Sequence, residues 1–121
     1  MAIIQLSRRA LLDIQDIQEY SIATWGELVA EEYLQNIEDA LNRLRLNPKL
    51  LSDKPEVSKS LCFYRVKQHF LVCAQFDEYI LILTVKHGAM GLPTRIQELE
   101  PSLQEEANML YQGIVESQGH S

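Results

Sequence analysis

Apolar residues recur at two different spacings along the chain, and the change of spacing separates helices from strands. The first apolar run, "AIIQL" at residues 2–6, is short and β-branched, which predicts a strand. After it, apolar residues recur at steps of three and four up to about Ala23. This spacing gives one apolar face and predicts an amphipathic helix that begins after Ser7, a residue suited to an N-cap.

The helical spacing resumes after a short break, with a buried stripe predicted from Leu28 to Leu44. Thr24 and Glu27 have the spacing of a capping box, which predicts that the second helix begins there. Asn-Pro at 47–48 ends it, because the residue before a proline resists helical geometry. Since so few residues separate the two helices, we expect an antiparallel hairpin.

Residues 50–60 form a polar connection in this interpretation, and three strand-like segments follow. The short breaks between the segments predict an antiparallel meander. Ser102 and Glu105 repeat the capping-box spacing, which predicts the start of a final helix. The three segments are Leu61–Lys67, His69–Phe76 and Tyr79–Lys86.

The predicted order of elements is β-α-α-β-β-β-α, which indicates an α+β fold. It comprises an N-terminal strand, an antiparallel α-helical hairpin, a three-stranded antiparallel meander and a C-terminal helix. A length of 121 residues with 46% hydrophobic content fits a single domain, residues 1–121, around one core. Residues from about 113 to 121 are expected to form a flexible tail.

The composition of the chain indicates in which compartment the protein is expected. No stretch approaches the roughly 20 apolar residues that span a bilayer, and the first residues lack the layout of a signal peptide. We therefore expect a cytoplasmic protein with no membrane partner. Cys62 and Cys73 have no CxxC spacing, so they are interpreted as buried free thiols in a reducing compartment.

The net charge of −6 is unevenly spread. Residues 96–121 contain five acids and no lysine or arginine, whereas residues 61–95 contain four cations and two acids. This balance is poor for a protein that binds mainly nucleic-acid phosphates, so we expect contact with nucleic acid only indirectly. A small cationic patch on the second half is compatible with it.

Four segments in order carry a resemblance: "LSRRALLDIQDIQEYSIATWG", "AEEYLQNIEDALNRLRLNP", "YRVKQHFLVCAQF" and "VKHGAMG". Together they resemble the ParE/RelE superfamily of toxins from bacterial toxin–antitoxin pairs, over about residues 3–99. The stretch "MGLPTRIQEL" looks most like the ParE branch. Cys62 and Thr84 stand where many members have arginine, which weakens the case for the RNA cleavage typical of the RelE branch.

The resemblance implies the toxin of a type II toxin–antitoxin pair that inhibits DNA gyrase. It implies a ParD-like antitoxin partner in a hetero-oligomer, bound in a groove along the helical hairpin and the sheet edge. It implies no enzyme activity and no cofactor. Two alternatives stay open: a ribosome-dependent mRNA endonuclease of the RelE type using Arg65, Lys67, His87 and Tyr111, or a toxin-fold binding module without toxicity.

His87 is the residue on which much of this interpretation depends. It ends the last predicted strand and is read as a structural residue of the turn, a partner contact or a catalyst. No residues at ligand spacing accompany it, so no metal site is predicted. Arg65 and Lys67 alternate with Val66, which predicts that both lie on one exposed sheet face. The candidate partner-binding residues are Arg65, Lys67, Lys86, His87, Met90 and Arg95.

Three aromatic or histidine residues receive plainer predictions. Trp25 is expected to pack in the turn of the helical hairpin, and His69 is expected to be a turn residue. Tyr111 is expected to pack on, or project from, the final helix. No catalytic residue is predicted.

Overall fold

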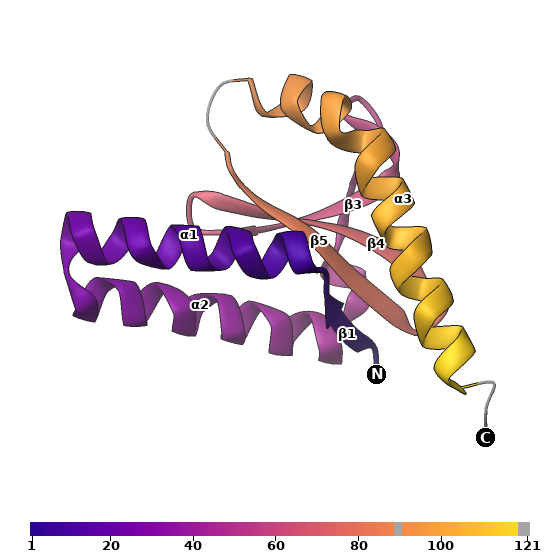
Figure 1. Ribbon diagram of the computed structural model, residues 1–121, viewed down its shortest axis with the longest axis horizontal. Helices are drawn as coiled ribbons and strands as arrows, with labels where there is room; N and C mark the ends of the chain where they lie inside the picture. The colour runs from indigo at the N-terminus through magenta and orange to yellow at the C-terminus, as the bar shows by residue number, and fades with distance from the viewer. Residues whose placement is uncertain (89–90, 119–121) are drawn as a thin grey trace.

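A five-stranded sheet lies between a helical hairpin and a long third helix (Figure 1). The strand order is β1-β5-β4-β3-β2, with β1 parallel to β5 and the other neighbours antiparallel. This computed structural model describes residues 1–88 and 91–118. The strands are β1 (Ile3–Leu6), β2 (Ser52–Lys54), β3 (Ser58–Val66), β4 (His69–Phe76) and β5 (Tyr79–His87); the helices are α1 (Arg8–Trp25), α2 (Glu27–Leu46), the 3-10 turn η1 (Pro48–Leu50) and α3 (Leu92–Gln118).

The predicted hairpin, meander and final helix are all present, but the sheet is mixed rather than antiparallel. The chain leaves the sheet after β1 and returns to it at the far edge, so the meander runs back toward β1 and its last strand arrives parallel to it. Strand β2 was not predicted. Its three polar residues carry no apolar pattern, and backbone pairing with β3 defines it.

Ser7 both caps α1 and attaches it to the sheet. Its Oγ accepts a hydrogen bond from the backbone N–H of Ala10 at 3.1 Å, as the sequence predicted. The same hydroxyl donates to the carbonyl oxygen of Leu83 at 2.8 Å. One buried side chain therefore fixes both the start of α1 and its position beside β5.

The predicted capping box of Thr24 and Glu27 is wrong, because Gly26 alone joins α1 to α2. Gly26 has φ +97°, a conformation that favours glycine, and its N–H donates to the carbonyl oxygens of Ser21 and Ile22. Glu27 is already the first residue of α2, whose start has no side-chain cap. The two helices meet so closely that Thr24 remains inside α1.

Helix α3 is one continuous helix, so the predicted cap of Ser102 and Glu105 is also wrong. Pro101 lies inside the helix, and both supposed capping residues are interior to it. Residues 113–118, which we assigned to a flexible tail, are helical as well. A bidentate ion pair between Arg9 of α1 and Glu106, with N–O distances of 2.9–3.2 Å, connects α3 to the hairpin.

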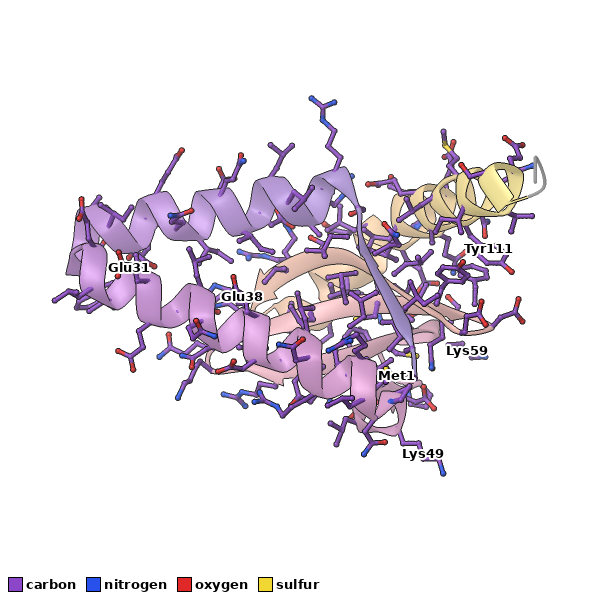
Figure 2. All side chains as sticks on the ribbon, turned by 90° about the horizontal axis from the view of Figure 1, so that it is seen from below. Met1, Glu31, Glu38, Lys49, Lys59 and Tyr111 are labelled. Atoms are coloured by element: carbon purple, nitrogen blue, oxygen red, sulfur yellow. The ribbon has the colours of Figure 1, made fainter. Side chains whose placement is uncertain are left out.

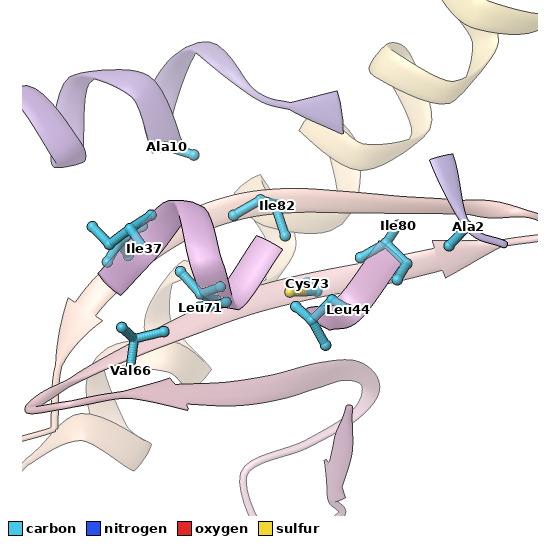
Figure 3. Packing of buried hydrophobic residues seen from close by; sticks show 11 residues of the cluster. Ala2, Ala10, Ile37, Leu44, Val66, Leu71, Cys73, Ile80 and Ile82 are labelled. Atoms are coloured by element: carbon cyan, nitrogen blue, oxygen red, sulfur yellow. The ribbon is translucent and has the colours of Figure 1, made fainter. Parts of the chain in front are cut away.

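Two apolar clusters fill the opposite faces of the sheet, because residues along each strand alternate between faces. On β4, Leu71 and Cys73 point to the hairpin, whereas Val72 and Ala74 point to α3. Figure 3 shows the cluster on the hairpin side. Both faces of the sheet therefore pack against helices. Helix α3 contributes three buried residues to the second cluster: Ile96, Leu103 and Ala107.

Cys62 and Cys73 are register partners on β3 and β4, and both are free thiols, as predicted. Cys73 is fully buried and Cys62 is half-buried. Burial raises the pKa of Cys62 to about 11 and raises the pKa of Cys73 as well. Both thiols are therefore protonated and unreactive near neutral pH. Across residues 1–88 and 91–118, no helix combines the length and apolar character needed to cross a membrane.

Candidate partner-binding site

The joined ends of α1 and α2 project past the strands, as Figure 1 shows. An open cavity of about 620 Å³ lies between this projecting part and the turn that joins β3 to β4. We call it the hairpin groove. Tyr20, Trp25 and Val29 line its hairpin side, and Lys67, His69 and His87 line its sheet side.

The hairpin side of the groove is apolar and exposed. Tyr20 and Trp25 are each 66% exposed, and Leu28 at the tip is 82% exposed. The sequence placed Trp25 in the packing of the turn and Leu28 and Val29 in a buried stripe, and these predictions are wrong. The apolar stripe is longer than the sheet it covers, so its outer part has nothing to pack against.

The sheet side of the groove is built around a histidine pair. His69 at the start of β4 is the register partner of His87 at the end of β5, and their rings meet edge to face with centroids 5.2 Å apart. The hydroxyl of Tyr33 on α2 hydrogen-bonds Nδ1 of His69. His69 lies at the start of β4, as the predicted segment His69–Phe76 placed it, and it links the sheet to the hairpin beyond the turn role expected of it.

Burial sets the protonation of this cluster. It raises the pKa of the Tyr33 hydroxyl to about 12, so this group keeps its proton at neutral pH. Burial, followed by the nearby charge of His87, lowers the pKa of His69. A neutral His69 accepts the hydrogen bond of Tyr33 at Nδ1, which leaves its proton on Nε2.

A bulge in β5, at Leu83, creates the histidine pair. Phe76 pairs with Tyr79 at the turn, and continuing that register would place His69 opposite Lys86. The register shifts between Val72 and Cys73, and beyond the shift His69 faces His87. The pair was not predicted, because the apolar alternation along the chain does not reveal a bulge of one residue.

Arg65 and Lys67 do not share one sheet face, contrary to the prediction. Arg65 lies on β3 opposite Phe70, with its guanidinium 5.7 Å from the centre of that ring. Lys67 lies in the β3–β4 turn with φ +55° and lines the hairpin groove. The two are still neighbours, because Nε of Arg65 donates to the carbonyl oxygen of Lys67 at 2.8 Å.

Lys86 is half-buried and turned toward α1. Its Nζ lies 4.0 Å from Oδ1 of Asp13. The other oxygen of Asp13 accepts hydrogen bonds from the hydroxyl of Thr84 and from the backbone N–H of Val85, the latter at 3.1 Å. Asp13 thus holds α1 against the free edge of β5, and Lys86 belongs to that attachment.

The remaining candidate residues are more scattered. His87 is exposed and its Nε2 lies 3.4 Å from Oε1 of Gln68, so within the described residues its contacts are across the sheet rather than with α3. Arg95 is an exposed residue near the start of α3. Met90 lies outside the described residues. Of the predicted set, the structure brings together Arg65, Lys67 and His87 around the β3–β4 turn.

Tyr111 lies far from these residues. Its ring stacks on Phe76 with centroids 4.7 Å apart, and its hydroxyl donates to Asp77 at 2.6 Å. This packing role was predicted. The ring of Tyr111 also contacts the ring of Tyr79, the first residue of β5. His87 ends the same strand, about 26 Å from Tyr79 along the strand axis. The four residues considered for RNA cleavage therefore do not form one site.

The part of the chain that the structure describes contains no evident metal site. No group of three or more His, Cys, Asp or Glu side chains there is arranged to hold a metal ion. The groove contains two carboxylates, Asp16 and Glu32, but they lie on its hairpin wall. The arrangement suits recognition of another surface: an apolar wall, a polar floor and an open mouth.

Comparisons with known proteins gave a family match and a match of fold. Residues 4–92 match the model of the family described as ParE toxin of type II toxin–antitoxin system, parDE. No protein of curated function matches the chain significantly in sequence. A solved structure of the chromosomal ParDE TA system from P. aeruginosa contains a chain of similar fold. The TM-score is 0.65 at 15% identity, and the match covers 74% of this chain and 98% of that chain.

Proposed function

The chain belongs to the family of ParE toxins of type II toxin–antitoxin systems, and we propose that it inhibits DNA gyrase in the cytoplasm when no antitoxin is bound. The observation that carries this proposal is the family match over residues 4–92, which spans the hairpin and the whole meander. The inhibition would work by binding, without a catalytic step. The separation of Tyr111 from His87 supports this view.

A ParD-like antitoxin is the second part of the proposal. It would bind in the hairpin groove and form a hetero-oligomer that keeps the toxin from its target. The exposed apolar wall of the groove supports this assignment, because a large exposed apolar surface marks a binding site. A partner segment that folds on binding can cover such a surface with few residues of its own.

The proposed inhibition of gyrase can be tested with purified, antitoxin-free protein. Circular dichroism first establishes that the protein is folded, and gyrase is then assayed for supercoiling and for DNA cleavage. We expect blocked supercoiling or an accumulation of cleaved DNA as the protein is titrated. Gyrase that is unaffected by a large excess of folded protein would contradict the proposal.

Arg65 and Lys67, the two cations at the β3–β4 turn, provide variants for the same assay. Replacing Arg65 and Lys67 together by alanine is expected to weaken inhibition about tenfold or more, the size of the loss when one central contact is removed. Lys59→Ala is the control, since Lys59 is an exposed cation on the same strand as Arg65. Equal inhibition by both variants would remove the turn from the gyrase contact.

A further inference from the structure

The negative charge of this protein is concentrated on the hairpin. Residues 10–42 contain eight carboxylates and no lysine or arginine. The other nine of the 17 carboxylates share the rest of the chain with all 11 lysines and arginines. Residues 10–42 therefore carry a net charge of −8, whereas the rest of the chain, including four arginines at the outer ends of the two hairpin helices, carries +2.

Seven of the eight hairpin carboxylates are exposed. The eighth, Asp13, is held by Thr84, Val85 and Lys86. Within residues 1–88 and 91–118, the ion pairs are those of Arg9 with Glu106 and of Lys86 with Asp13, so none of the seven is in one. Figure 2 shows two of them, Glu31 and Glu38, spaced along α2.

Two of these carboxylates border an exposed apolar surface. Asp16 and Glu32 lie on the wall of the hairpin groove, among Tyr20, Trp25 and Val29. Carboxylates that only keep a helix soluble do not have to lie beside exposed aromatic and apolar side chains, as these two do. An apolar surface with a carboxylate border matches a partner whose apolar face is bordered by cations.

The charge also excludes other occupants. A second copy of this chain would bring an equally anionic hairpin against the first, and like charges across an interface are strongly unfavourable. Nucleic acid and anionic lipid surfaces are repelled for the same reason. On the sheet side, Lys67 is the one lysine or arginine among the residues that line the groove.

We propose that the segment bound in the hairpin groove is a cationic, amphipathic helix, with lysine or arginine flanking its apolar side chains. The inference rests on the proposed function, in that the antitoxin is the protein expected to provide this segment. A helix is the element whose side-chain ridges fit the grooves of two antiparallel helices. Apolar side chains would enter between Trp25 and the histidine pair, and cations would meet Asp16 and Glu32.

Two designed peptides of about 16 residues, long enough to form a helix, test the chemistry directly. Both have the same apolar face of leucine and tryptophan; one has lysine and the other glutamate on the flanking positions. Binding to the folded, full-length protein is measured by fluorescence anisotropy at two salt concentrations. We expect the lysine peptide to bind at least about tenfold more tightly at low salt, with the difference shrinking as salt is added.

Variants of the protein locate the interaction. Asp16→Asn combined with Glu32→Gln is expected to weaken binding of the lysine peptide about two- to tenfold. The control combines Glu98→Gln with Glu105→Gln, which removes the same charge from exposed positions on α3. The control is expected to bind the peptide as the unchanged protein does.

Several results would overturn the inference. They are equal binding of the two peptides, preference for the glutamate peptide, binding of neither, an equal loss in the α3 control, or self-association of the protein through the hairpin. The outcome is separate from that of the gyrase assay. If the lysine peptide binds the groove but gyrase is unaffected, the inferred partner chemistry stands and gyrase is not the target. If gyrase is inhibited but neither peptide binds, gyrase stands as the target and the inferred partner chemistry is wrong.

Discussion

Asp13 shows how much one side chain can contribute to this fold. It is a residue of α1, yet its carboxylate accepts hydrogen bonds from Thr84 and from the backbone N–H of Val85. β1 pairs with residues 79–82 of β5, so the later part of that strand has no neighbouring strand on this side. Asp13 takes the place of a strand there by providing an acceptor for a backbone donor.

Asp13→Ala is therefore expected to lower the free energy of unfolding by about 1–3 kcal/mol, because it leaves the Val85 N–H and the Thr84 hydroxyl without their acceptor. Urea unfolding measures the change. Glu19→Ala is the matched control, since Glu19 is an exposed acid on the same helix. A variant at Asp13 that is as stable as the control would show that the edge of β5 needs no acceptor.

The histidine pair gives the molecule a pH dependence. Because the folded-state pKa of His69 lies below the ordinary value of 6.5, the unfolded chain binds more protons as pH falls. The stability linked to this residue is complete above about pH 6.5 and is lost as pH falls through the folded-state pKa. The Tyr33 contact to Nδ1 of a neutral His69 should weaken over the same range.

NMR titration of the histidine ring protons checks this directly. We expect a midpoint for His69 below 6.5. In His87→Gln the midpoint should move part of the way back toward 6.5, since the variant removes the neighbouring charge and leaves the burial in place. A midpoint at or above 6.5 in the unchanged protein would contradict the assignment.

At the scale of elements, the hairpin depends on the conformation of one glycine. Gly26 has φ +97°, and an added Cβ there would meet no atom within 4 Å. Gly26→Ala should therefore cost about 1–3 kcal/mol of stability through backbone strain alone. Gly113 also has open space around it but lies inside α3.

Gly113→Ala is consequently expected to stabilise the protein by about 0.5–1 kcal/mol, since alanine favours a helix where glycine does not. The opposite signs of the two changes, measured by urea unfolding, separate backbone strain from crowding. Destabilisation of equal size at both positions would mean that an added methyl group itself is harmful.

The elements themselves were largely predictable from the sequence, because periodicity reports local structure. Helix α1, helix α2 and the meander all follow from apolar spacing. Helix boundaries were less predictable: Thr24 and Ser102 look like caps, but Gly26 and the uninterrupted turn of helix around Pro101 decide the local backbone. A side chain that suits a cap forms one only where the helix actually begins.

At the scale of the whole molecule, the limits of sequence reasoning are contacts between distant segments. The parallel pairing of β1 with β5 and the one-residue bulge that aligns His69 with His87 depend on the assembled sheet. A groove along the hairpin was expected, but the residues of its hairpin wall were missed for a related reason. Trp25 and Val29 continue an apolar stripe, and the sequence does not say where the sheet beneath that stripe ends.

The pairing of β1 with β5 also sets an order of events during synthesis. Ser7 and Leu83, which are joined by a hydrogen bond, are 76 residues apart in the chain. At typical translation rates of about 5–20 residues per second, roughly 4–15 seconds separate the synthesis of Ser7 from that of Leu83. The two helices can form early from local contacts, but closure of the sheet comes late. A nascent chain stalled before Tyr79 therefore displays the apolar stripe of the hairpin to chaperones and partners without yet being a folded toxin.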